Sequence, residues 1–157
     1  MTEDALLALV AQYRAGIEAE IALLHQLGGI ARRQHALAES KALDEIPDLV
    51  DRRNRVMASL VAVEHEMKPV RGALVADRDA LVRLPAYDGL ATLHQEASSL
   101  VTGILSADKG SLSALRDAEE ARRFASRAIE QGESTLAAYR RVVAPPLEGA
   151  TLVNRKG

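Results

Sequence analysis

A heptad stripe between Ile46 and Leu84 constrains this chain more than any other feature. Apolar residues recur at alternating steps of three and four, and ten of the twelve positions are apolar. This spacing is typical of a long helix that buries one narrow seam against other helices, whereas a strand would need a period of two. The stripe therefore predicts a helical bundle or coiled coil. Its positions are Ile46, Leu49, Arg53, Val56, Leu60, Val63, Met67, Val70, Leu74, Asp77, Leu81 and Leu84.

Two polar residues and a proline interrupt this seam. Arg53 and Asp77 would lie about 36 Å apart on one helix at 1.5 Å per residue, so they cannot pair with each other. We expect each to find a partner on another helix, to reach the edge of the seam, or to mark the point where packing ends. Pro69 removes one backbone hydrogen bond, yet the apolar phase continues through it. We therefore predict one kinked helix that ends before Pro85.

A second apolar stripe predicts a helix from about Thr2 to Ser40, with Thr2 as its N-cap. The pair Gly28-Gly29 costs about 2 kcal/mol relative to alanine, so the helix could break there or pass through with a local bend. Because no polar loop surrounds the pair, we predict one continuous helix. Its stripe consists of Leu6, Val10, Tyr13, Ile17, Ile21, Leu24 and Leu27.

The second half of the chain predicts two further helices. Asp88 is expected to cap the third, whose apolar spacing continues to Ile104. The polar cluster Ser106–Ser111 is typical of a loop, and its last serine would cap a fourth helix that stops at Pro145-Pro146.

Long helices joined by short turns fold back on one another. We therefore predict an all-α fold, an elongated antiparallel four-helix bundle with long coiled-coil-like helices. The bundle would form one domain over residues 1–144, and residues 145–157 would form a flexible C-terminal tail.

Composition limits the classes of function. The charged residues are mixed in sign with a net charge of -2, which gives no reason to expect nucleic-acid binding. The absence of cysteine excludes disulfides and thiolate chemistry. No apolar run approaches the roughly 20 residues that cross a bilayer, so we expect no membrane insertion. The acidic N-terminus lacks the basic region of a secretory signal, which favours a cytoplasmic location.

No catalytic or metal-binding motif is present, so we expect neither enzymatic activity nor a cofactor or metal. The segment His25-Gln26-Leu27-Gly28-Gly29 is similar to the His-x-Leu-Lys-Gly sequence of histidine phosphotransfer domains. Gly28 replaces the phosphate-binding lysine, so an ordinary helix histidine is favoured and phosphotransfer is kept as an alternative. Glu64 and Glu66 flank His65, and we expect them on a solvated helix face.

A basic run at Arg52, Arg53 and Arg55 follows Asp48 and Asp51 by one turn. Ion pairs at i,i+4 are therefore available to Arg52 and Arg55. Arg53 falls on the seam and could instead bridge to another helix.

In residues 48–64 a leucine and basic residues precede the run Leu60-Val61-Ala62-Val63-Glu64. This segment most strongly resembles the FlgN-like chaperones of flagellar export, and the resemblance extends from Ala5 to Tyr139. Residues 67–71 are similar to the segment that follows in the family. Leu136–Arg140 resembles the family's C-terminal helix with its tyrosine.

The resemblance implies a cytoplasmic chaperone that binds the C-terminal region of hook–filament junction proteins and delivers them to the type III export apparatus. Recognition would place an apolar client segment on an apolar helix face, without a covalent step. A second hypothesis is a structural coiled-coil or helical-bundle oligomer that binds no client, and either protein could be a homo-oligomer. We expect the fourth helix and the tail to bind the client, through Ile129, Leu136, Tyr139, Val142 and Val143. Leu136 and Tyr139 are also seam positions that could belong to the core.

Overall fold

The computed structural model describes the backbone of residues 1–143 and the side chains of residues 1–138. The described residues are almost entirely helical and contain no strand, which confirms the all-α fold class. Contacts divide the chain into an N-terminal unit, Met1–Leu115, and a C-terminal unit, Arg116–Gly157. The predicted domain boundary at residue 144 and the tail of residues 145–157 lie at or beyond the end of the described residues.

Helix α1 spans Glu3–Ser40 and passes through Gly28-Gly29 without a break, as predicted. The Thr2 side chain caps it by accepting a hydrogen bond of 3.2 Å from the Ala5 amide. All seven predicted stripe residues are buried. At its C-terminus, Lys41 adopts a left-handed conformation with φ 59°, and its amide donates to carbonyls of the last turn.

A short 3-10 turn, η1 (Leu43–Glu45), leads into α2 (Ile46–Ala76), where Pro47 occupies the first turn. Helix α2 continues through Pro69, which confirms the prediction of a helix uninterrupted by this proline. None of its seam positions is exposed to solvent.

The predicted end of this second helix near Leu84 is wrong, because α2 stops at Ala76. Asp77 is its C-cap, and the Asp77 carbonyl accepts hydrogen bonds from Ala80 and Leu81 that begin the short helix α3 (Arg78–Leu81). Aspartate favours caps and turns over helix interiors because its side chain competes for backbone hydrogen bonds. Asp77 thus marks the end of the helix. Packing does not end there as expected, because Leu81 beyond it is fully buried.

After the 3-10 turn η2 (Pro85–Tyr87), helix α4 spans Leu90–Val143. It runs through Ser106–Ser111, so the predicted loop there is wrong and the expected third and fourth helices are one. The predicted cap Ser111 is an interior helix residue. Gly89 precedes the helix with φ +85°. The Asp88 carbonyl accepts a hydrogen bond of 2.9 Å from the Arg14 side chain.

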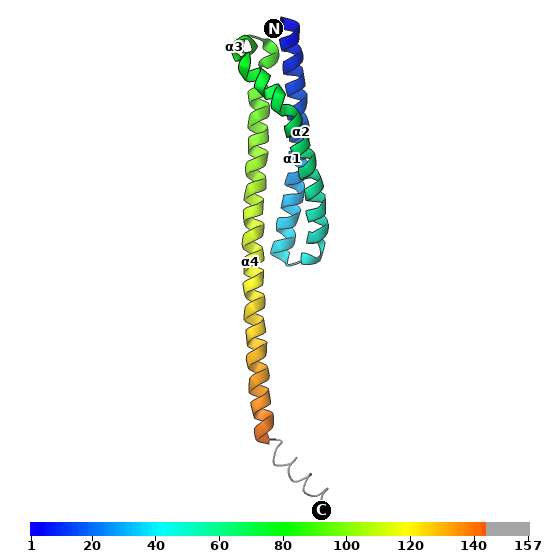
Figure 1. Cartoon of the computed structure of the whole chain (residues 1–157). Coiled ribbons are helices and arrows are strands. Elements are labelled where there is room, and N and C mark those ends of the chain that lie inside the picture. The colour runs from blue at the N-terminus through cyan, green and yellow to red at the C-terminus, as the bar shows by residue number, and fades with distance from the viewer. Residues whose placement is uncertain (144–157) are drawn as a thin grey trace, which may run out of the picture. The chain divides into compact units, whose positions relative to one another are not determined.

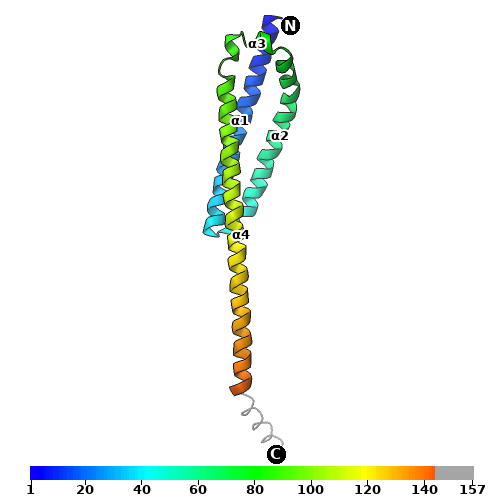
Figure 2. The ribbon, with the colours of Figure 1, turned by 90° about the vertical axis from the view of Figure 1, so that its left-hand side faces the viewer.

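Within the N-terminal unit, α1, α2 and the first half of α4 form a bundle (Figures 1 and 2). The views show that α2 runs antiparallel to α1, and that the first half of α4 runs antiparallel to α2. Three apolar clusters fill the space between them. One includes Val10, Met67 and Leu81, the next Leu27, Ala31 and Ile104, and the last Ile30, Leu37 and Leu49.

Candidate interaction surface

The C-terminal part of α4 carries an exposed apolar face. Between residues 118 and 136, small and apolar side chains recur at helical spacing on one side of the helix, while most charged residues lie on the other side. We call this face the α4 stripe: Ala118, Ala121, Ala125, Ala128, Ile129, Gly132 and Leu136. Ile129 is 63% exposed and Leu136 is 68% exposed, and Phe124 at the border of the stripe is 76% exposed.

An amphipathic helix of this kind normally buries its apolar side against another element. From residue 121 to residue 138, every described side chain is exposed. The small residues of the stripe would allow a partner helix to approach closely, while Ile129 and Leu136 supply larger apolar side chains. The stripe can therefore bind an apolar helix face, and its residues offer no catalytic group.

Two of the five predicted client-binding residues, Ile129 and Leu136, belong to the α4 stripe. Both are exposed, and neither belongs to the three apolar clusters of the described residues. Tyr139, Val142 and Val143 lie in the last turn and a half of α4, and their side chains fall outside the described residues. Their role stays a prediction.

A half-buried ion pair joins α4 to α2 in the N-terminal unit. The Arg53 guanidinium donates two hydrogen bonds of 2.6 Å to the Asp108 carboxylate and one of 3.0 Å to the Gln34 side chain. The hydrogen bond to Asp108 raises the pKa of Arg53 above its ordinary value. The expectation that Arg53 bridges to another helix is confirmed. Asp108 lies inside the segment predicted to be a loop, and its pairing helps to explain why that segment is helical.

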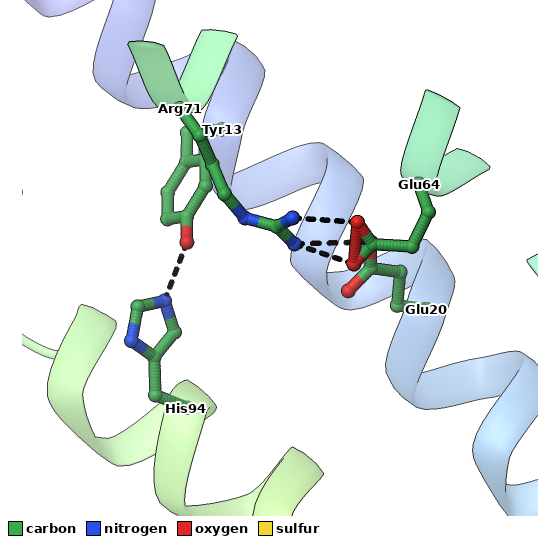
Figure 3. Close-up of polar contacts among 5 residues, drawn as sticks. All are labelled: Tyr13, Glu20, Glu64, Arg71 and His94. Carbon is green, nitrogen blue, oxygen red and sulfur yellow. Dashed lines mark hydrogen bonds and ion pairs between the residues drawn. The ribbon is translucent and has the colours of Figure 1, made fainter. Parts of the chain in front are cut away.

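A second polar cluster joins α1 to α2 (Figure 3). Arg71 donates hydrogen bonds of 2.5 and 2.6 Å to the two oxygens of Glu64, and its guanidinium lies 3.6 Å from Glu20 Oε1. Glu20 is 6% exposed, and this oxygen has no hydrogen-bond partner among the described residues. The predicted solvated helix face is confirmed for Glu66, which is exposed, but is wrong for Glu64, which is half-buried against Arg71 and Glu20.

The two carboxyl groups of this cluster have opposite pKa shifts. Burial, together with the nearby charge of Glu64, raises the pKa of Glu20 to about 7. The hydrogen bond from Arg71 lowers the pKa of Glu64. Below about pH 7, the Glu20 carboxyl therefore retains a proton that it can donate to the Glu64 carboxylate.

The same region contains a contact between α1 and α4. The Tyr13 hydroxyl lies 2.7 Å from His94 Nε2, and the two rings meet edge to face with centroids 5.6 Å apart. Sequence reasoning predicted none of the polar contacts of Tyr13, Glu20, Arg71 and His94. The available signal was Glu20 itself, a carboxylate three residues after Ile17 on the buried side of α1.

The phosphotransfer alternative gains no support from the surroundings of His25. Its Nε2 lies 3.5 Å from Glu96 Oε1, and the imidazole is 60% exposed. A carboxylate at this distance would repel an incoming phosphoryl group. Among residues 1–138, no three His, Asp or Glu side chains gather in a way that could hold a metal ion.

Comparison with protein-family profiles, with curated proteins and with solved structures finds no match to this chain. None of the helices in the described part of the chain combines the length and apolar character that crossing a membrane requires.

Proposed function

We propose that this protein is a cytoplasmic export chaperone that binds an amphipathic client helix on the α4 stripe. The proposal rests on one observation: Ile129 and Leu136 lie on one face of a long helix and are exposed among small residues. A helix laid along this face would cover both side chains, which is the helix-in-groove type of recognition. Binding and release would be the whole of the activity.

The resemblance to FlgN-like chaperones supplies the client. We propose that the C-terminal region of a hook–filament junction protein binds the stripe, and that the complex is delivered to the type III export apparatus. Covering the client's apolar segment would prevent it from assembling before export. Tyr139, Val142 and Val143 would extend the binding surface toward the end of α4.

Calorimetric titration of the full chain with purified hook–filament junction proteins tests this proposal. We expect binding by the wild-type chain and a loss of affinity of about 100-fold or more in Ile129→Glu/Leu136→Glu, because two central apolar anchors are removed. Gln131→Glu/Ser134→Glu is the matched control. It adds the same charge two residues away from each anchor, about 200° around the helix, and should bind like wild type.

The exposed stripe also supports the alternative of a structural oligomer, in which the stripe pairs with that of a second copy. Sedimentation of the same variants separates the two functions. If no junction protein binds and Ile129→Glu/Leu136→Glu converts a stable oligomer to a monomer, the chaperone proposal is overturned in favour of the oligomer. A wild-type chain that binds a client and loses only that binding in the variant supports the chaperone.

A further inference from the structure

A cationic groove lies between α1 and α2 in the N-terminal unit, and the α4 stripe contributes nothing to it. The groove has a volume of about 340 Å³. Ile30, Leu49 and Val56 form its apolar floor, and its walls carry Arg33 from α1 and Arg52 and Arg55 from α2. Cationic groups therefore face the same space from both helices.

The charges in this groove are largely uncompensated. No aspartate or glutamate is among the residues that line it, although the chain as a whole has a net charge of -2. Arg52 and Arg55 have no carboxylate within ion-pair distance among the described residues, so the pairs available with Asp48 and Asp51 do not form.

Arg33 has one partner, Glu45, at 2.9 Å. The Arg33 side chain is 58% exposed and that of Glu45 is 62% exposed. An ion pair this exposed to water contributes little to stability, so a carboxylate from another molecule can replace Glu45 at little cost. All three arginines are therefore accessible to an anionic ligand.

The groove also has room for a side chain. Gly29 is in its lining, and a Cβ atom added there would meet nothing within 4 Å. Apolar residues lie next to this open space. A simple inorganic anion would use the arginines but gain nothing from the apolar floor, whereas a peptide with carboxylates around a leucine would use both.

We propose that this groove binds an acidic amphipathic segment of a partner protein. The carboxylates of the segment pair with Arg33, Arg52 and Arg55, and an apolar side chain enters the space over Gly29. The inference is independent of the client proposed for the α4 stripe, because the two surfaces share no residue.

Fluorescence anisotropy of a fluorescein-labelled peptide of three Glu-Glu-Leu-Leu repeats, titrated with the full chain at low salt, tests the proposal. We expect saturable binding that weakens as salt rises, because the attraction is between exposed charges. Arg52→Glu/Arg55→Glu should weaken binding by about tenfold or more. The matched control, Lys68→Glu/Lys109→Glu, makes the same change in charge at exposed positions outside the groove and should bind within about twofold of wild type.

Two further measurements test whether the peptide binds in the groove. Gly29→Leu fills the open space, keeps all the charges and favours the helix, so it should fold and still lose peptide affinity. A Gln-Gln-Leu-Leu peptide should bind about tenfold more weakly than the acidic one. Circular dichroism melts verify that each variant is folded. If Arg52→Glu/Arg55→Glu is unfolded, the peptide affinity of Gly29→Leu tests the proposal instead.

The proposal is overturned if the wild-type chain does not bind the acidic peptide, or if both charge-reversal variants weaken binding equally. Equal binding of the glutamine peptide, or unchanged binding by Gly29→Leu, also overturns it. Calorimetric binding of pyrophosphate in the absence of peptide binding would instead assign the groove to a small anion.

Discussion

Glu20 couples the stability of the bundle to pH. Its folded-state pKa of about 7 lies above the ordinary value of 4.5, so the folded protein holds a proton that the unfolded chain releases. The contribution of Glu20 to the free energy of unfolding is therefore fully present below about pH 4.5, and it is lost as pH rises toward 7. The Glu20 side chain is 8% exposed, and the full loss amounts to roughly 3 kcal/mol.

We predict that Glu20→Gln removes most of this dependence. The amide cannot ionise, so the variant should be more stable than wild type by about 1–3 kcal/mol at pH 8 and closer to it at pH 5. Urea denaturation across this pH range measures the difference. Glu66→Gln, at an exposed position of α2, is the control and should follow the wild-type profile. A wild-type profile that is flat between pH 5 and pH 8 would contradict the prediction.

Glu64 acts in the opposite direction. Because the hydrogen bond from Arg71 lowers its pKa below 4.5, its contribution is present above that pH and is lost as pH falls further. Losing Arg71 would remove the cation from two carboxyl groups at once. The cluster is thus a site where one residue's ionisation depends on the other two.

At the scale of elements, much of the fold could be predicted from apolar spacing alone. The stripe of α1 is buried, and the seam of α2 is buried or half-buried, where the period placed them. Helix α2 continues through Pro69 and α1 through Gly28-Gly29, and in both the phase is preserved. The same argument applies to Ser106–Ser111, since Leu100, Ile104, Ala107 and Ser111 retain the helical spacing. The polar composition of this segment is typical of a loop, yet the helical spacing continues through it, and the expected loop is wrong.

The polar contacts could not be predicted in this way. Whether Arg53 meets Asp108, or Arg71 meets Glu20, depends on how three helices are placed in space rather than on spacing within one helix. The candidate site could be predicted in part from the sequence, since Ile129 and Leu136 follow from the heptad phase. Their exposure could not be predicted, because heptad spacing in a sequence is the same whether the side chains are buried or exposed.

Close packing of α1 on α2 depends on Gly16. A Cβ atom added there would collide with the thioether of the buried Met67, so a substitution forces this side chain to move. Gly16→Ala also gains about 1 kcal/mol of helix propensity. We predict that the effect of Gly16→Ala on the free energy of unfolding is less favourable in wild type than in a Met67→Ala background. The difference should be about 1–3 kcal/mol, the usual cost of overpacking.

A double-mutant cycle in urea denaturation measures this coupling. Gly72→Ala is the control, because a Cβ atom there meets nothing within 4 Å and the substitution should be insensitive to Met67. Equal effects of Gly16→Ala in the two backgrounds would show that Met67 does not restrict the contact.

At the scale of the whole molecule, stability and the proposed client binding belong to different parts of the chain. All three apolar clusters, the Arg53–Asp108 pair and the Glu20–Glu64–Arg71 cluster lie within Met1–Leu115. The α4 stripe lies within Arg116–Gly157, where every described side chain after residue 120 is exposed. A fragment of residues 1–115 should therefore fold by itself.

We predict that this fragment unfolds cooperatively with a midpoint within about 5 °C of the full chain, because it retains the core. It should no longer bind the client proposed for the α4 stripe. A peptide of residues 116–138 should have low helicity in isolation, because a single helix without tertiary contacts is only marginally stable in water. Circular dichroism measures both fragments, and addition of a binding client should increase the helicity of the peptide. A fragment of residues 1–115 that is unfolded under conditions where the full chain is folded would show instead that the C-terminal half of α4 helps to hold the bundle together.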